Sequence, residues 1–178
     1  MENIEVEIRS FITKEKYEHL LGFLAEEGKL VGEDYQETYY FDSDEDLRIQ
    51  KNNFYSKIWL KKGKIHDDHR EEIEVRLEKD RFPELERLFL ALGYGVQIKW
   101  FRTRHTFDWQ DVSVMVDYTK GYGYIIEIEK MSTEGGKART LETLKGKMNA
   151  LGIVLTPKED FDSRYKHYKE NWKELTKA

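Results

Sequence analysis

The feature that most constrains the fold of this chain is a strict alternation of charged and apolar residues. Residues 5–9 read Glu-Val-Glu-Ile-Arg, and residues 72–76 read Glu-Ile-Glu-Val-Arg. Because successive side chains of a β-strand point to opposite faces, each segment places its charges on one face and its aliphatic residues on the other. Alternation of period two predicts eight strands, near residues 2–9, 36–42, 46–51, 55–62, 70–77, 96–107, 111–118 and 123–130.

Four other segments carry apolar residues at the three- and four-residue spacing of amphipathic helices. They cover residues 14–27, Pro83 to Leu92, residues 137–151, and the chain that follows Pro157. Residues 52–53 and 121–123 read as hairpin turns, so neighbouring strands are expected to be antiparallel. We therefore predict an α+β fold: an eight-stranded antiparallel β-barrel, or tunnel, with helices packed outside, forming a single domain over residues 1–178.

The composition excludes several classes of protein and of site. The chain has 178 residues, of which 35 are acidic and 30 basic, with a net charge of −5 and no cysteine. Without cysteine there is no disulfide, zinc–thiolate site or iron–sulfur cluster. The mild negative charge argues against a general nucleic-acid binder, which needs a surplus of basic residues. The chain has no run of about 18 apolar residues and no signal-like N-terminus, so we expect a cytoplasmic protein without a membrane partner, its oligomeric state left open.

The charged faces of the predicted strands allow two interpretations. Each face is either the solvated side of a sheet, or part of a binding site that uses both signs of charge. Carboxylate doublets lie on three strands, while basic residues dominate the corresponding faces of three others. Carboxylates two residues apart on a strand are separated by about 7 Å and repel one another unless a cation is near. Mg²⁺ or Mn²⁺ prefers such oxygen ligands together with substrate phosphates, and arginine and lysine bind phosphates, so we favour a polyphosphate site.

The charged residues belong to short motifs that follow one another in a definite order. They are Glu5-x-Glu7-x-Arg9, Tyr40-Phe41-Asp42-Ser43, Leu47-Arg48-Ile49, Trp59-Leu60-Lys61-Lys62-Gly63, Arg70-x-Glu72-x-Glu74, Arg102-x-Arg104, Val116-Asp117, Gly121-Tyr122-Gly123-Tyr124, Glu127-Ile128-Glu129 and Ser163-x-Tyr165. No single motif is specific. In this order and spacing they resemble the motifs of the CYTH superfamily, the triphosphate tunnel metalloenzymes, along nearly the whole chain.

The resemblance implies an eight-stranded tunnel that holds a triphosphate and one or two divalent cations, Mg²⁺ or Mn²⁺. The metal candidates that it implies are Glu5, Glu7, Asp117, Glu127 and Glu129. Glu72 and Glu74 either contact a metal or its water, or pair with tunnel arginines. Candidates for binding the phosphates are Arg9, Arg48, Lys57, Lys61, Arg76, Arg102 and Arg104. The catalytic candidates are Glu5, Glu7, Arg9 and Tyr40, of which the last resembles a tyrosine assigned to catalysis in thiamine triphosphatases.

Two positions depart from the family pattern. Arg9 stands where the family has lysine, so a role as base is lost while phosphate binding survives, because a guanidinium stays charged. Gln50 replaces a second arginine. The sequence thus predicts a divalent-metal-dependent hydrolase of inorganic tripolyphosphate, thiamine triphosphate or a nucleoside triphosphate. The alternatives are a class IV adenylyl cyclase, which makes cyclic AMP and pyrophosphate, and a non-catalytic binder of polyphosphate or nucleotide.

One further segment and one absent signal bear on the site. The run His66-Asp67-Asp68-His69 is expected to be a solvated loop rather than a metal site, because it lies between two strands among polar residues. A cyclase also needs a pocket for adenine and ribose, and no segment of the sequence indicates one.

Overall fold

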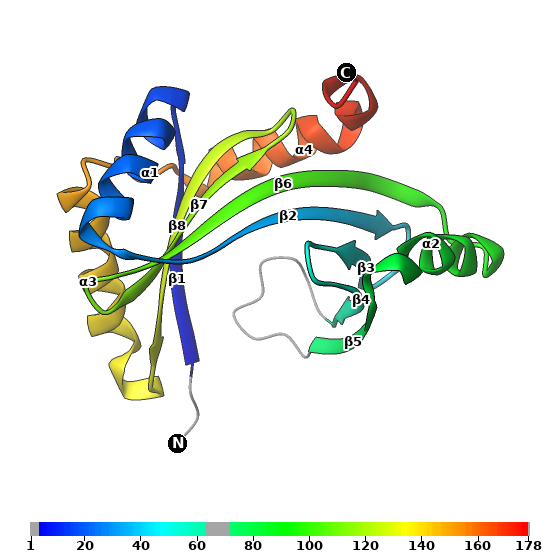
Figure 1. Ribbon diagram of the computed structural model, residues 1–178, viewed down its shortest axis with the longest axis horizontal. Coiled ribbons are helices and arrows are strands. Elements are labelled where there is room, and N and C mark those ends of the chain that lie inside the picture. Colours follow the sequence, from blue (N-terminus) through cyan, green and yellow to red (C-terminus); the bar gives the residue numbers. More distant parts are fainter. Residues whose placement is uncertain (1–3, 63–71, 178) are drawn as a thin grey trace. The chain divides into compact units, whose positions relative to one another are not determined.

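The computed structural model describes residues 4–62 and 72–177 (Figure 1). The strands in these ranges are β1 (Ile4–Ile12), β2 (Lys29–Phe41), β3 (Asp46–Lys51), β4 (Tyr55–Lys61), β5 (Glu72–Glu78), β6 (Val96–Trp109), β7 (Val112–Thr119) and β8 (Gly123–Ser132). The helices are α1 (Lys14–Glu27), α2 (Phe82–Ala91), α3 (Lys137–Ala150) and α4 (Lys158–Leu175), with 3-10 turns η1 (Lys79–Arg81) and η2 (Glu134–Gly136). The run His66–His69 and Arg70 lie outside the described residues.

The strands form one sheet in the order β1-β8-β7-β6-β2-β3-β4-β5. This confirms the predicted α+β class and the eight-stranded antiparallel sheet. β1 and β5 are the two ends of the strand order, so the closure into a barrel that the sequence led us to expect is not confirmed. The chain divides into two compact units: unit 1 is Met1–Glu33 with Thr103–Lys166, and unit 2 is Asp34–Arg102 with His167–Ala178.

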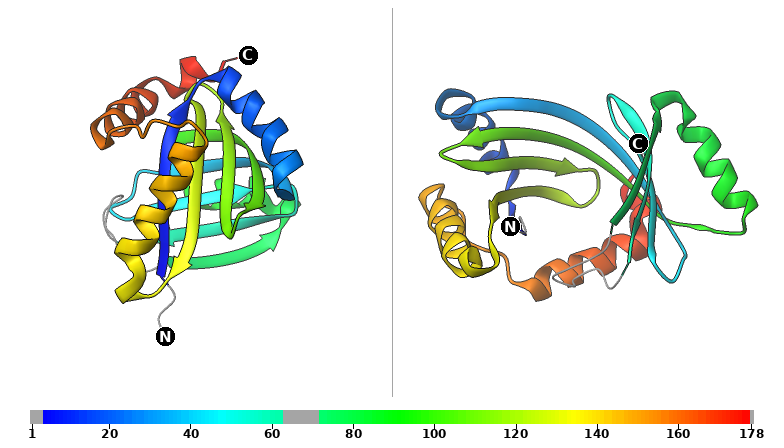
Figure 2. Two further views of the ribbon diagram at one scale, coloured as in Figure 1. Left: turned by 90° about the vertical axis from the view of Figure 1, so that its left-hand side faces the viewer. Right: turned by 90° about the horizontal axis from the view of Figure 1, so that it is seen from below.

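Unit 1 is a sheet covered by helices on one face. Figure 2 (left) shows α1 and α3 in front of the strands β1, β8 and β7. The helices bury their apolar stripes, including Leu24 and Leu144, against aliphatic residues of the strands such as Val114 and Ile128, all of them 0% exposed. α1 begins where Thr13 Oγ1 accepts a hydrogen bond from Lys16 N at 3.2 Å. The opposite face of the same strands carries the charges.

In unit 2, the helix α2 covers one face of the strands. Phe82, Leu85 and Phe89 of α2 pack on Tyr39 and Ile49 of the neighbouring strands. The second half of α4 also belongs to this unit, where the hydroxyl of the buried Tyr168 donates to the Lys99 carbonyl at 2.8 Å and the Trp172 indole donates to the Gln97 carbonyl at 2.9 Å. Within the described ranges, no helix combines the length and the apolar character that crossing a bilayer requires.

Two local features differ from the sequence-based expectation. β2 begins at Lys29 instead of near residue 36, because Gly28 ends α1 in an extended conformation and the chain runs straight on into the strand. The hairpin between β6 and β7 turns at Gln110 and Asp111, whose positive φ values of 45° and 66° fit a two-residue turn. The predicted turn at 121–123 is confirmed, since it joins the antiparallel strands β7 and β8.

Candidate metal and phosphate site

The pairing of β1 with β8 brings carboxylates face to face in unit 1. Glu7 lies opposite Glu129, and Arg9 lies opposite Glu127. The apolar residues on the other face pin this register, because a shift by one residue would turn Val6 and Ile128 out of the core. Like charges directly opposite one another destabilise a sheet. The fold therefore maintains a repulsive arrangement that a bound cation would relieve.

Three carboxylates come closest together and form what we call the acidic cluster: Glu5, Glu7 and Glu129. Each offers one oxygen, and these oxygens all lie within 4.8 Å of one another. Mg²⁺ binds oxygen at about 2.1 Å in octahedral geometry, so neighbouring ligands are about 3.0 Å apart and each of the three side chains would have to move by about 1 Å to bind one ion. The all-oxygen donor set fits a hard divalent cation.

The pKa of Glu129 reflects this crowding. Burial, and then the charges of Glu5 and Glu127, raise the pKa of Glu129 from its ordinary 4.5 to about 7, although Arg104 acts in the opposite direction. A carboxyl group with a raised pKa in the folded protein favours folding fully only below pH 4.5. That contribution is lost as the pH rises to about 7.

We therefore expect Glu129→Gln to stabilise the metal-free protein at high pH. In urea unfolding with a chelator present, the free energy of unfolding of the variant should match that of the native chain near pH 4.5. At pH 8 it should exceed it by about 1–2 kcal/mol, a value reduced for partial solvent screening. An equal difference at both pH values would contradict the raised pKa of Glu129. Adding Mn²⁺ at pH 8 should stabilise the native chain more than the variant.

Two other predicted metal ligands of unit 1 are bound by an arginine. Arg104 Nη2 lies 2.7 Å from Asp117 Oδ2 and 3.2 Å from Glu127 Oε1, and its Nε lies 2.9 Å from Asp117 Oδ1. Burial works to lower the pKa of the Arg104 guanidinium, yet the charges of Asp117 and Glu127 raise it above its ordinary value. Arg104, predicted from the sequence to bind phosphate, here acts as the counter-ion of two carboxylates.

In unit 2 three cations surround one aromatic ring, an arrangement that we call the Trp59 cluster. Lys61 Nζ lies 4.0 Å, Lys57 Nζ 4.1 Å and Arg48 Cζ 5.0 Å from the centre of the Trp59 ring. All four residues come from β3 and β4, with Arg48 directly opposite Trp59. The three cations were predicted as phosphate ligands, and the sheet gathers them on the face opposite α2.

The acidic residues predicted on β5 divide into two cases. Glu74 bonds to Lys57 Nζ at 2.7 Å and to Arg76 Nε at 2.6 Å. Burial works to raise its pKa, but these two hydrogen bonds lower it below the ordinary value. The sequence left open whether Glu74 contacts a metal or its water, or pairs with an arginine. Within unit 2, Glu74 pairs with Arg76 and also with Lys57. Glu72 lies opposite Lys61 in the strand register.

The remaining predicted residues of unit 2 make local contacts. The Tyr40 ring lies under the Arg48 guanidinium, 4.4 Å from centre to Cζ. Arg102 Nε donates to Gln36 Oε1 at 2.9 Å. Gln50, where the family has arginine, is buried and donates to Thr38 Oγ1 at 2.8 Å, so a neutral pair stands in place of a cation.

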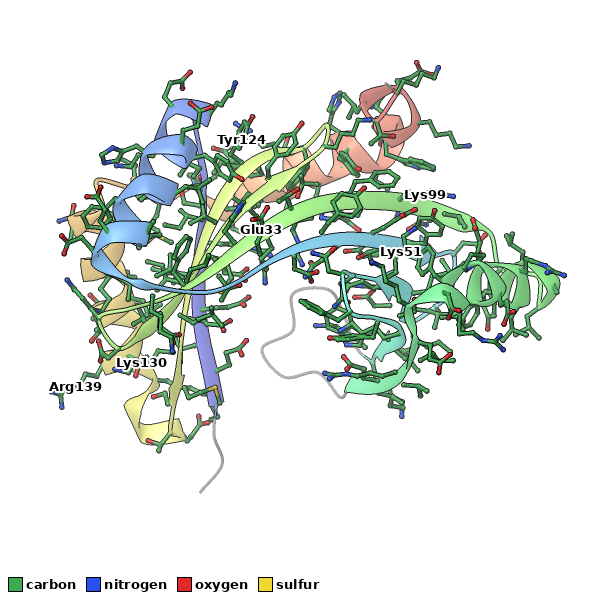
Figure 3. All side chains as sticks on the ribbon, viewed as in Figure 1. Glu33, Lys51, Lys99, Tyr124, Lys130 and Arg139 are labelled. Atoms are coloured by element: carbon green, nitrogen blue, oxygen red, sulfur yellow. The ribbon has the colours of Figure 1, made fainter. Side chains whose placement is uncertain are left out.

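Cations on the other face of unit 2 have structural partners. Lys51 and Lys99, both labelled in Figure 3, belong to the side covered by α2. Lys51 Nζ lies 2.7 Å from Glu37, and Lys99 Nζ lies 3.1 Å from Glu86 and 3.9 Å from the Tyr39 ring centre. Their charges stabilise the packing of α2 on the strands.

Arg9 has a partner that sequence reasoning did not identify. Its guanidinium lies 5.0 Å from the centre of the Phe161 ring of α4. Among the described residues it makes no hydrogen bond or ion pair, so its donors remain available for an anion. The apolar stripe of α4 had marked Phe161 as a packing residue, and no signal in the sequence connects it with β1.

Comparison with known proteins gives one family and a set of related structures. The family model for the CYTH domain matches residues 3–165. No curated protein matches the chain. A conserved hypothetical protein from Pyrococcus furiosus is similar in structure, with a TM-score of 0.67 at 24% identity, over 84% of this chain and 91% of that one.

Two further similar structures are those of putative cyclases. A putative adenylyl cyclase from Hippeastrum, described as revealing a dominant triphosphatase activity, has a TM-score of 0.67 at 18% identity, over 93% of this chain and 96% of that one. A putative adenylate cyclase from Vibrio parahaemolyticus has a TM-score of 0.65 at 15% identity, over 92% and 99%. At these identities the likeness establishes a shared fold.

Proposed function

The chain belongs to the CYTH domain family, and from that premise we propose that it is a divalent-metal-dependent hydrolase of a triphosphate-containing substrate. The observation that carries the proposal is the acidic cluster, in which Glu5, Glu7 and Glu129 oxygens converge within 4.8 Å. Solvated faces of sheets do not need opposed carboxylates in a fixed register. A site for a cation that accompanies phosphates does, because the cation neutralises both its ligands and its substrate.

Different residues are proposed to bind the metal and the phosphates of such a substrate. In unit 1 the acidic cluster is proposed to hold Mg²⁺ or Mn²⁺, and Arg9 to bind phosphate oxygens by charge-assisted hydrogen bonds. Taken by itself, the Trp59 cluster of unit 2 is a second candidate for binding phosphates. A bound divalent cation would neutralise charge on the phosphates in the loose transition state of phosphoryl transfer.

A hydrolase must also orient a water molecule and accept its proton. Asp117 and Glu127 are held in place by hydrogen bonds from Arg104. We propose that a carboxylate of the acidic cluster accepts the proton as the water oxygen attacks the terminal phosphorus. The bond from that phosphorus to the bridging oxygen then breaks, the diphosphate part of the substrate leaves with the bridging oxygen, and the terminal phosphoryl group becomes orthophosphate. Tyr40 and Arg76 keep the roles predicted for them, catalytic and phosphate-binding respectively.

The experiment that tests this function is a substrate panel. We expect purified protein with Mn²⁺ or Mg²⁺ to release orthophosphate from tripolyphosphate, thiamine triphosphate or ATP, with products resolved by chromatography, and to lose all release in excess chelator. Release that is unchanged by the chelator would contradict the role of the metal.

The same panel separates the alternatives. Cyclic AMP with pyrophosphate from ATP would identify an adenylyl cyclase, and two of the similar structures are of putative adenylyl cyclases. Tight binding of tripolyphosphate without turnover would identify a binding module. Either result would replace the hydrolase proposal.

A further inference from the structure

A pocket of about 360 Å³ lies at the far end of the charged face of β1, entirely within unit 1. Its walls are the end of β1 with Phe11, the segment 154–157 between α3 and α4, and the α4 residues Asp160 and Arg164. We call it the β1–α4 pocket. Its volume falls in the range of small-molecule sites, which begins at about 300 Å³. Sequence reasoning found no such pocket, because its walls come from opposite ends of the chain.

The wall formed by residues 154–157 is fixed to the free edge of β1. Ser10 Oγ donates to the Val154 carbonyl at 2.8 Å, and Phe11 N donates to Thr156 Oγ1 at 3.0 Å. Ser10 is 0% exposed. The pocket is therefore a built feature of the edge strand, since its shape is held by buried hydrogen bonds.

Four side chains interlock between β1 and α4 beside this pocket, and we call them the aromatic ladder: Arg9, Phe161, Phe11 and Arg164. Arg9 Cζ lies 5.0 Å from the Phe161 ring centre, the two phenyl rings stack at 4.5 Å, and Arg164 Cζ lies 4.2 Å from the Phe11 ring centre. The ladder orients both guanidinium groups. It connects the proposed phosphate ligand Arg9 with the pocket residue Arg164.

Arg164 and Asp160 have chemistry suited to a heterocyclic base. They lie four residues apart on α4, hence on one face of the helix, and both line the pocket. Within the part of the chain that the structure describes, the Arg164 guanidinium and the Asp160 carboxylate make no hydrogen bond or ion pair. A guanidinium plane stacks on bases, and a carboxylate accepts hydrogen bonds from an exocyclic amino group.

The order of residues along β1 matches the order of groups in a metal-bound nucleoside triphosphate. Glu5, Glu7, Arg9 and Phe11 occupy alternate positions, so they share one face and follow one another at about 7 Å. Along that face, Glu5 and Glu7 are the proposed cation ligands, Arg9 is the proposed phosphate ligand, and Phe11 lines the pocket.

We infer that the β1–α4 pocket binds the amino-bearing base of a nucleoside triphosphate, with Arg164 stacking on the base and Asp160 accepting its amino group. The inference rests on the proposed function and narrows its substrate class. Inorganic tripolyphosphate would occupy only the metal and phosphate positions.

The test compares ATP with inosine triphosphate, which has a carbonyl in place of the amino group. The affinity for a non-hydrolysable ATP analogue with Mg²⁺, measured by calorimetry, should exceed that for the inosine analogue about tenfold, the value of one charge-assisted hydrogen bond. Asp160→Asn should reduce this ratio to near one, and Arg164→Ala should weaken both nucleotides about tenfold. Hydrolysis of tripolyphosphate should be unchanged in Asp160→Asn.

The matched control is Glu159→Gln, which removes an exposed carboxylate from the same first turn of α4 outside the pocket. It should leave the nucleotide ratio as it is. Equal affinities for the two analogues, or ratios unaffected by Asp160→Asn, would overturn the inference while tripolyphosphate hydrolysis could continue. Absence of all hydrolysis with base discrimination intact would overturn the proposed function and keep the pocket.

Discussion

Replacing Glu5 with glutamine is expected to lower metal-dependent hydrolysis on the order of 1000-fold while leaving the fold intact. The amide has nearly the same shape as the carboxylate but carries no charge, and it is a poor ligand for Mg²⁺ or Mn²⁺. Glu5 is exposed on β1 and shares its cluster with two other carboxylates, so its neutralisation removes repulsion rather than a packing contact. Initial rates across a series of Mn²⁺ concentrations, together with thermal unfolding, measure both effects.

The sequence contains its own control for this variant. Glu84 and Glu86 repeat the Glu-x-Glu spacing inside α2, where the two side chains do not share a face, and Glu84 pairs only with exposed Arg81. Glu84→Gln should retain full activity. Full activity in Glu5→Gln as well would contradict the proposed role of the acidic cluster in hydrolysis.

Replacing Arg104 with methionine is expected to destabilise the protein by about 3 kcal/mol at pH 8. The side chains of Asp117 and Glu127 are only 5% and 14% exposed, so without the guanidinium two nearly buried carboxylates lose their counter-charge. Urea titrations at pH 8 measure the difference in free energy of unfolding between the variant and the native chain.

Arg76→Met is the matched control, because Arg76 also pairs with a glutamate but its side chain is 64% exposed. Exposed ion pairs contribute about 0–1 kcal/mol, so this variant should be close to the native chain. Should the two variants lose equal stability, the counter-ion role of Arg104 would be wrong.

The features of this fold that could be predicted are those that depend on residues close together in the sequence. The two faces of β1 could be predicted because alternation is a property of neighbouring residues, and Val6 and Ile8 do contact the core. The register that sets Glu7 opposite Glu129 could not, because those residues lie at opposite ends of the chain. The sequence offered seven carboxylates as metal candidates, whereas the structure brings Glu5, Glu7 and Glu129 closest together.

Roles that depend on partners were also beyond the sequence. Arg104 has the residue type and strand position expected of a phosphate ligand. Only the structure shows that its guanidinium donates a hydrogen bond to Asp117. Phe161 fits an apolar stripe equally well whether it packs in a core or beneath a guanidinium. Its contact with Arg9 is tertiary and leaves no periodic signal.

The pairing of the first strand with the last has a consequence for how the chain matures. β1 is made first and β8 late, so the apolar side of β1 waits for most of synthesis before its partner strand exists. Contacts this distant in sequence are slow to form. The acidic cluster is complete only when they do, and a nascent chain or a fragment that lacks Glu129 has no such cluster for a cation to bind. Cation affinity would then report that the chain has finished folding.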